Sequence, residues 1–279
     1  MTIDRRRFLL SAVLATLAGG ANANTALRFG VVPYLTARRL AMLYEPARAF
    51  FERDLGRPVQ FSSAPDYSVH LERLRAREYD LVADSLPIAR LAQRELGYLP
   101  LARTVVPLQP ILVTAKDSPL RTPNELRGRA VAVSDRIAAL TIVGLRFLRD
   151  KGLPTDSAVT IKVAGSHANA IQRVLAGEAA AAIVSRTTLK QIEPALASRV
   201  RLMAELPQAL SAVVYAASPA LAAQANGLGQ RLIEFASREP DGKTFIETLG
   251  HQGLLPTGSE MAQVDPLVVE FYRQLNSTE

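Results

Sequence analysis

The stretch VAVSDRIAALTIVGLRFL, Val131 to Leu148, indicates a buried strand that runs directly into a helix. Its first residues are short and apolar, and polar Ser134 and Asp135 stand where the strand should end. In an open α/β sheet, ligands bind beyond the carboxyl ends of the strands. A helix that starts at such a point directs its amino end, which favours anions, toward the ligand. The sequence therefore predicts a binding loop here.

Strand and helix patterns alternate on both sides of this stretch. Short apolar runs that stop at proline or polar residues indicate strands, and longer amphipathic runs indicate helices. The first helix is predicted in YEPARAFFERDLG, with Pro46 in its first turn and Gly56 at its end. Such alternation is typical of parallel sheets covered by helices on both faces. The predicted strands lie in ALRFGVVP, RPVQFSSA, DLVADS, QPILVTA, RAVAVSD, VTIKVAG, AAAAIVS and SAVVYAA.

Two strands that end in Ser-Pro, one within 110–119 and one within 212–219, bracket the second strand–helix series. We interpret both as crossings between two open α/β lobes that enclose a cleft. Lobe one is expected to comprise residues 24–116 and 211–279, and lobe two residues 117–210. Closure of the lobes over a ligand is then expected as a hinge motion.

The amino-terminal segment has the pattern of an export signal. DRRRFLLSAVLATLAGGANA has a basic start, a short apolar core and small residues up to Ala23. This pattern predicts a signal peptide over residues 1–23. The run RRRFL, residues 5–9, favours the twin-arginine export route, and an ordinary secretory signal that carries three arginines is the alternative. Either route predicts a periplasmic protein.

The composition excludes several classes of site. There is no cysteine, so disulfides, thiolate metal sites and cysteine nucleophiles are excluded. The three histidines are scattered without metal-ligand spacing, and neither a phosphate-binding glycine motif nor a paired acid and base is visible. We therefore expect no metal, no cofactor and no catalysis. The net charge is +7, but the arginines are spread singly along predicted helices, so nucleic acid is not an expected partner.

Several segments, taken in their order and spacing, resemble one known family. They are FGVVP, YEPARAFFERDLGRPV, APDYSVHLERLRAREYDLVA, AGSHANAIQRVLAGEAAAAIV and FIETLGHQGLLP. These segments are similar to those of the phosphate-, phosphite- and phosphonate-binding proteins of ABC transporters. The resemblance implies a bilobal, type II-like periplasmic-binding-protein fold without catalysis. It also implies a small anionic ligand, an ABC transporter permease as partner, and a monomeric protein.

The loop after the opening strand departs from the pattern of that family. The family pattern resembles Asp-Pro-x-Ser-Thr-Ser-Gly, whereas this chain has DRIAALT at residues 135–141. Alanine and leucine thus replace the three hydroxyl residues. Losing three charge-assisted hydrogen bonds, each worth about 1.5–3 kcal/mol, predicts much weaker phosphonate binding. The more apolar loop favours an organic acid or a modified phosphonate with an apolar portion.

Ten residues in the loops beyond the strand ends are candidate ligand contacts. Tyr67 and His167 each stand at a helix start facing the cleft, although each could instead be a structural residue. Asp84 could meet a cationic group or cap the next helix, and Arg136 could replace the lost hydroxyls or remain solvated. The candidates are Tyr34, Tyr67, Asp84, Ser85, Ser134, Arg136, Ala138, Ser166, His167 and Arg186. The residues expected to be structural instead are Asp66, as a helix cap, His70 and His251.

Two functions remain open from the sequence. The leading hypothesis is a periplasmic solute-binding protein that captures its ligand between the lobes for an ABC importer. The alternative is a periplasmic sensory protein that binds a small molecule and presents it to the ectodomain of a membrane receptor kinase.

Overall fold

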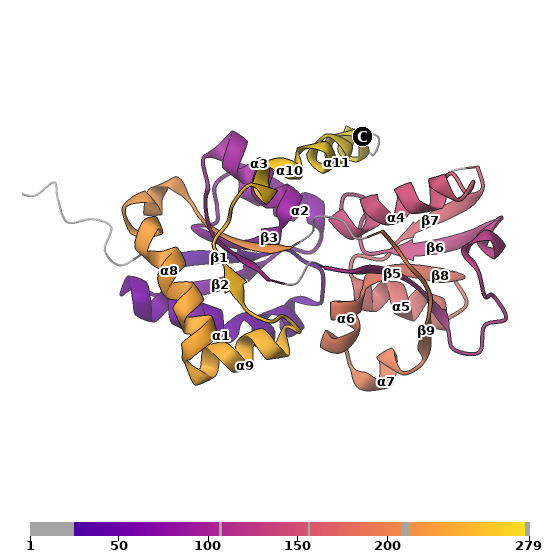
Figure 1. The fold of residues 1–279 in the computed structure, drawn as a ribbon, viewed down its shortest axis with the longest axis horizontal. Coiled ribbons are helices and arrows are strands. Elements are labelled where there is room, and N and C mark those ends of the chain that lie inside the picture. Colours follow the sequence, from indigo (N-terminus) through magenta and orange to yellow (C-terminus); the bar gives the residue numbers. More distant parts are fainter. Residues whose placement is uncertain (1–24, 106–107, 156, 208–211, 277–279) are drawn as a thin grey trace, which may run out of the picture.

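The computed structural model shows two α/β lobes lying side by side (Figure 1). It describes residues 25–105, 108–155, 157–207 and 212–276, so the predicted signal peptide, residues 1–23, lies outside the described residues. None of the described helices is both long and apolar enough to cross a bilayer. The predicted α/β class with two open sheets is confirmed.

Lobe one is built on a six-stranded sheet with the order β11-β4-β10-β3-β1-β2. β1 runs parallel to β2 and β3, whereas β10 is antiparallel to β3 and β4. Helices α1, α8 and α9 cover one face, and α2, α3, α10 and α11 cover the other (Figure 1). The strands are β1 (Leu27–Val31), β2 (Val59–Ser63), β3 (Leu81–Ser85), β4 (Leu99–Thr104), β10 (Val213–Ala217) and β11 (Leu254–Leu255). The helices are α1 (Ala37–Leu55), α2 (Tyr67–Arg75), α3 (Leu86–Leu96), α8 (Ala222–Arg238), α9 (Pro240–Thr248), α10 (Glu260–Gln263) and α11 (Asp265–Asn276), with a 3-10 turn at Pro219–Leu221.

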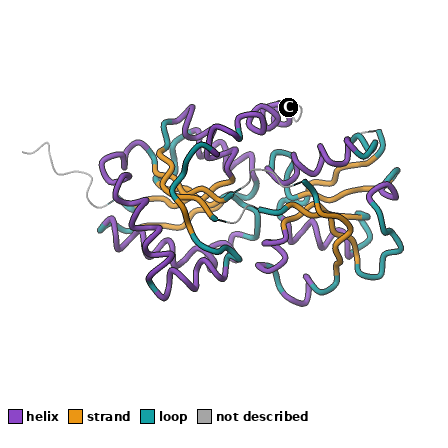
Figure 2. The backbone as a smooth tube through the Cα atoms, in the orientation of Figure 1, coloured by secondary structure: helices purple, strands orange, loops and turns teal. Residues whose placement is uncertain are grey.

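Lobe two repeats this plan on a five-stranded sheet with the order β7-β6-β8-β5-β9. β6 runs parallel to β7 and β8, whereas β5 is antiparallel to β8 and β9. Figure 2 shows the strands as the middle layer of each lobe, with helices outside. The strands are β5 (Pro110–Ala115), β6 (Arg129–Val133), β7 (Val159–Val163), β8 (Ala181–Ser185) and β9 (Val200–Glu205). The helices are α4 (Ala139–Asp150), α5 (His167–Leu175), α6 (Arg186–Gln191) and α7 (Pro194–Ala197), with a 3-10 turn at Pro123–Leu126.

The chain passes from lobe one to lobe two before β5 and returns before β10. The sequence analysis placed residues 110–116 in lobe one, whereas sheet pairing places β5 in lobe two, where Ile111 lies opposite Val184. The reason is that strand pairing joins residues distant along the chain. An apolar run therefore predicts a strand without showing which sheet receives it.

Helix α1 begins earlier than the sequence predicted. Thr36 caps it by accepting a hydrogen bond from the amide of Arg39, so Pro46 lies inside the helix and not in its first turn. The prediction that the helix begins at Pro46 is wrong, because burial of Leu40 and Leu43 before the proline favours the longer helix. This burial offsets the loss of one helical hydrogen bond and the ring clash, together about 3 kcal/mol.

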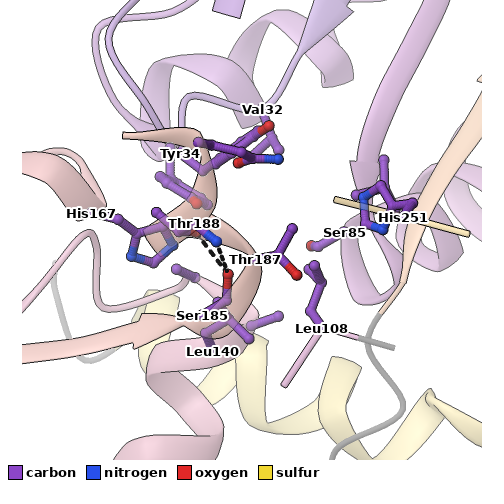
Figure 3. A pocket seen from close by; sticks show the side chains of 15 residues that line it. Val32, Tyr34, Ser85, Leu108, Leu140, His167, Ser185, Thr187, Thr188 and His251 are labelled. Atoms are coloured by element: carbon purple, nitrogen blue, oxygen red, sulfur yellow. Dashed lines mark hydrogen bonds between the residues drawn. The ribbon is translucent and has the colours of Figure 1, made fainter. Parts of the chain in front are cut away.

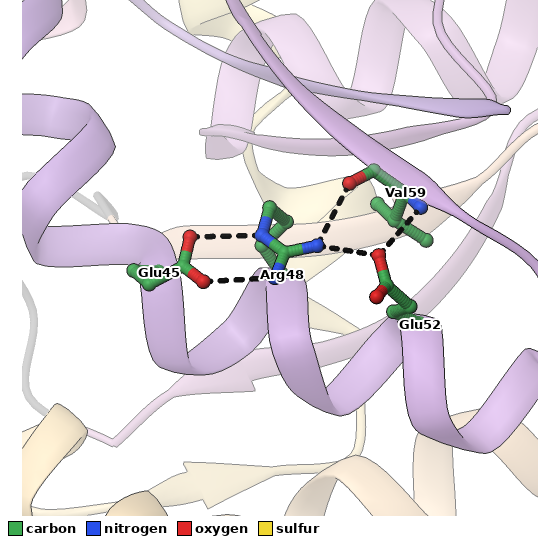
Figure 4. Close-up of polar contacts among 4 residues, drawn as sticks. All are labelled: Glu45, Arg48, Glu52 and Val59. Carbon is green, nitrogen blue, oxygen red and sulfur yellow. Dashed lines mark hydrogen bonds and ion pairs between the residues drawn. The ribbon is translucent and has the colours of Figure 1, made fainter.

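An arginine network joins α1 to the adjacent strand β2 (Figure 4). The Arg48 guanidinium contacts both oxygens of Glu45, one oxygen of Glu52 at 2.6 Å and the carbonyl oxygen of Val59 at 2.9 Å. Glu52 in turn accepts a hydrogen bond from the Val59 amide at 3.0 Å, and this bond is the main reason that its pKa is lowered. The network orients β2, whose end leads into the cleft.

Two glycines of α8 give a matched test of packing against the sheet. A Cβ on Gly229 would lie 2.6 Å from the carbonyl oxygen of Leu101, which is backbone of β4 and cannot rotate away. A Cβ on Gly227 would meet only the flexible end of Arg231. Gly229→Ala is expected to lower the free energy of unfolding by about 2 kcal/mol through overpacking. Gly227→Ala should leave it unchanged or raise it by up to about 1 kcal/mol, because alanine favours helix. Urea unfolding of both variants measures the difference, and equal effects would contradict the close packing.

Candidate functional site

A cavity lies between the lobes. Both lobes contribute to its wall (Figure 3). The sequence predicts six strand-end loops, and each supplies at least one lining residue. These loops are residues 33–35, 62–67, 83–85, 134–138, 165–167 and 185–187. This follows from the topology, because parallel strands of each sheet end at the edge that faces the other lobe. The lining residues are Val32, Tyr34, Tyr67, Ser85, Leu108, Ala138, Ala139, Leu140, His167, Ser185, Thr187, Thr188, Gln191, Val213 and His251.

The amino ends of five helices, α2 to α6, lie at this cavity. Three of these ends are closed by their own side chains. Asp66 accepts from the Val69 amide at 2.8 Å, and Ser166 and Ser185 make the same kind of bond in α5 and α6. The other two ends have no side-chain cap. Ser85 makes no capping hydrogen bond at α3, and the N-cap residue of α4 is Ala138, which has no side-chain acceptor. The first amides of α4 therefore remain available to a ligand.

The loop before α4 carries its own carboxylate. Asp135 accepts a hydrogen bond from the Ile137 amide at 3.0 Å, two residues before the helix begins. Burial is the largest influence on this carboxyl and raises its pKa. An anion at α4 would thus meet free amides in the helix and a negative side chain beside them.

Two buried tyrosines supply hydroxyl groups to the wall. Burial raises the pKa of Tyr34 to about 12, and its hydroxyl lies 3.5 Å from that of Tyr44. Burial also raises the pKa of Tyr67, and the carboxylates of Asp135 and Asp84 raise it further. Both hydroxyls are therefore neutral and can donate hydrogen bonds at physiological pH.

Two histidines complete the polar part of the wall. His167 is 2% exposed and His251 7% exposed. Burial lowers the pKa of each to about 4, so both rings are neutral at physiological pH. The Nδ1 atom of each ring has no hydrogen-bond partner within the described part of the chain. A ligand that enters the cavity can satisfy these atoms.

The lobes are in direct contact around the cavity. The His167 amide donates to the Tyr34 carbonyl at 3.1 Å. Arg39 Nε donates to the Gln191 carbonyl, and Gln191 Nε2 donates to the Leu249 carbonyl, both at 2.9 Å. A shared apolar cluster also joins the lobes, since Phe271 of α11 packs with residues of the α4 region. The structure therefore describes the lobes in a closed arrangement.

The ten candidate residues divide into two groups. Those that line the cavity are Tyr34, Tyr67, Ser85, Ala138 and His167. Those that lie outside the lining set are Asp84, Ser134, Arg136, Ser166 and Arg186. Contact with a ligand stays a prediction for all ten.

Three residues of the second group are held by other interactions. Asp84 is fully buried and contacts His70 Nε2 at 3.0 Å. Arg186 forms an ion pair with Glu205. Ser166 is used as the cap of α5.

Sequence reasoning missed most of the wall supplied by α6 and the carboxyl-terminal segment. Thr188 and Gln191 belong to α6, a helix that was not predicted. His251 was expected to be structural, but its ring lies in the wall. One available signal was Thr187, which follows the predicted loop residue Arg186. No strand or helix pattern points to His251, because it reaches the cavity only when the carboxyl-terminal segment folds back on lobe one.

The chain was compared with known proteins. The model of a family described as "ABC transporter, phosphonate, periplasmic substrate-binding protein" matches residues 29–261. No curated protein sequence matches. Among solved structures, PhnD1 of Prochlorococcus marinus, in complex with methylphosphonate, is 15% identical with a TM-score of 0.79, covering 90% of this chain and 98% of that chain. A binding protein component of an ABC phosphonate transporter from Pseudomonas aeruginosa is 14% identical with a TM-score of 0.78, covering 92% and 89%.

A third similar structure has a different ligand. The alkanesulfonate-binding protein SsuA of Xanthomonas axonopodis pv. citri, bound to MOPS, is 20% identical with a TM-score of 0.62, covering 91% of this chain and 94% of that chain. At these identities, the solved structures establish the bilobal fold.

Proposed function

This chain belongs to the family of periplasmic substrate-binding proteins of phosphonate ABC transporters, and from that premise we propose that it captures a small organic anion between its lobes for an ABC importer. The resemblance read from the sequence is confirmed, and so is the periplasmic location. The family is one of transport proteins and not of enzymes.

The observation that carries the proposal is the uncapped amino end of α4 at an enclosed and partly apolar cavity. Free amides at a helix start stabilise anions through hydrogen bonds and the helix dipole. Ala138, Ala139 and Leu140 provide an apolar surface beside those amides. These features favour an anionic head group that carries a small apolar substituent.

The ligands of similar proteins agree with this chemistry. PhnD1 of P. marinus was solved with methylphosphonate, and SsuA of X. axonopodis with the sulfonate buffer MOPS. Both compounds join an oxyanion to a carbon chain. The missing hydroxyl side chains at residues 138–140 lead us to expect weaker phosphonate binding here than a loop with three hydroxyls would give.

A binding screen tests the proposed function. The mature protein is titrated with methylphosphonate, 2-aminoethylphosphonate, phosphate, alkylsulfonates and short carboxylates, using thermal shift followed by calorimetry. A ligand present at 100 times its Kd should add about 2.7 kcal/mol to the free energy of unfolding. No stabilisation by any of these anions would contradict the proposal.

The transport role and the sensory role require different partners, an ABC transporter permease and the ectodomain of a receptor kinase. One solved structure similar to this chain is a histidine kinase sensor domain, 17% identical with a TM-score of 0.59. That likeness concerns the fold alone. We expect a monomer in size-exclusion chromatography that stimulates ligand uptake by vesicles containing the cognate permease. Ligand-dependent binding to a receptor ectodomain without such uptake would favour the sensory role.

Ligand binding is expected to close the lobes. The cavity wall comes from both lobes, so a ligand must enter when they are apart. Small-angle scattering should give a smaller radius of gyration at saturation than in the ligand-free protein. An unchanged scattering profile at saturation would contradict hinge closure.

We propose that residues 1–23 form a twin-arginine signal peptide that is removed after Ala23. Replacing both Arg5 and Arg6 with lysine is expected to block export, because that route requires arginine at the pair. Cell fractionation measures export, and mass spectrometry of the periplasmic protein determines its first residue. Continued export of the lysine variant would indicate the general secretory route.

A further inference from the structure

Among the residues that the structure describes, the lining of the cavity includes no charged side chain. None of its 15 lining residues is arginine, lysine, aspartate or glutamate. The attraction for an anion therefore comes from amide dipoles and neutral donors alone. A helix terminus contributes the equivalent of only about half an elementary charge.

The buried imidazoles do not supply the missing positive charge. His167 and His251 lie in the wall with their Nδ1 atoms unpartnered among the described residues (Figure 3). Because burial lowers the pKa of both rings to about 4, each ring is neutral across the physiological range. A neutral imidazole offers one donor and one acceptor. These nearly buried nitrogens can therefore bind a polar group of a ligand in the cavity.

Charged groups outside the lining act on its residues and on the loop before α4. Asp135 precedes α4. Burial raises its pKa, whereas the hydrogen bond that it accepts from the Ile137 amide acts in the opposite direction and favours the ionised form. Asp84 precedes the lining residue Ser85 in the chain. The carboxylates of Asp135 and Asp84 both act on the hydroxyl of Tyr67 in the wall. Two cations oppose these carboxylates. Arg39 acts on Tyr34 but directs its Nε to the Gln191 carbonyl, and Arg136 acts on its neighbour Asp135.

From this arrangement we infer that the cavity selects a singly charged oxyanion with a small alkyl group, such as an alkylsulfonate, over a doubly charged phosphonate. The inference rests on the proposed function, and it adds the charge of the ligand. A single negative charge can be matched by the free amides of α4 and by neutral hydroxyl and imidazole donors. A second charge would find no cation among the lining residues to balance it and would be repelled by Asp135, whose negative charge Arg136 offsets only in part.

Three ligands of similar size separate charge from shape. Methanesulfonate and the monomethyl ester of methylphosphonate carry one charge at all relevant pH values, whereas methylphosphonate loses its second proton near neutral pH. Calorimetry is carried out from about pH 6 to about pH 9, a range in which the buried histidines stay neutral. The two singly charged ligands should bind with constant affinity. The affinity for methylphosphonate should fall by up to tenfold per pH unit once the dianion dominates.

The outcomes distinguish this inference from the proposed function. Methylphosphonate affinity that is constant or rises with pH would overturn the selection of single charge and leave anion capture intact. Failure of all three ligands at every pH would overturn anion capture itself.

A variant tests the role of the loop carboxylate. Asp135→Asn keeps an oxygen that can accept from the Ile137 amide but removes the charge. It should improve the affinity for the methylphosphonate dianion relative to methanesulfonate by at least tenfold. Asp150→Asn is the matched control, because Asp150 is exposed at the opposite end of the same helix. An equal preference ratio in both variants would contradict the role given to Asp135.

Discussion

Replacing Ala139 with aspartate is expected to weaken anion binding by about 100-fold or more. Ala139 is the first residue of α4, is 8% exposed and lines the cavity. An aspartate there would take the free amides for its own carboxylate and repel the ligand. Losing one or two hydrogen bonds to a charged group, each worth about 1.5–3 kcal/mol, accounts for a change of this size.

The same variant should not weaken the fold. A carboxylate in the first turn stabilises a helix by about 0.3–1 kcal/mol. Thermal unfolding and calorimetry on the same sample should therefore change in opposite directions. Ala139→Asn is the uncharged control of similar size and should lose much less affinity. Unchanged binding in Ala139→Asp would show that the ligand head group lies elsewhere in the cavity.

The second large effect is expected at the buried pair His70 and Asp84. Both side chains are fully buried, and His70 Nε2 lies 3.0 and 3.1 Å from the two Asp84 oxygens. His70→Leu leaves a buried carboxylate without this partner, which should lower the free energy of unfolding by about 3–5 kcal/mol. The double variant His70→Leu/Asp84→Leu removes both polar groups and should recover a large part of this loss.

Urea unfolding of the two single variants and the double variant measures the coupling between the residues. Additive effects would contradict a direct interaction. The pair also connects α2 to the end of β3, so it holds Tyr67 and Ser85 in position at the cavity. We therefore expect the His70→Leu variant to bind its anion less tightly under conditions in which it is still folded.

A local sequence pattern can place candidate residues at the cavity, but it cannot show which of their side chains line it. Tyr67 and His167 were found because each follows a strand and a capping residue, and those features are short-range. Asp84 occupies an equivalent strand end, but its side chain turns to His70, fourteen residues earlier in the chain. Arg186 stands in a strand-end loop and pairs with Glu205 of β9. A local pattern places a residue at an edge without determining which way its side chain turns.

The missed strands have a related cause. β4 and β9 are only partly buried, so their residues do not form the continuous apolar runs that mark the central strands. β5 is a clear apolar run, but its pairing with β8 and β9 is decided by contacts formed across the chain. β4 and β9 were therefore difficult to predict because they are only partly buried, and the lobe of β5 was difficult to predict because its pairing is not local.

The sequence by itself determined the alternation of strands and helices, the two series that became two lobes, and the six loops that meet at the cavity. These features depend on periodicity and caps within a few residues. The tertiary structure alone decided that β5 joins lobe two and that Gln191 and His251 enter the wall. It also decided that the lining residues within the described ranges include no charged side chain. The physical reason is that these features arise when segments far apart in the chain pack together, and burial then sets both the direction of a side chain and its charge.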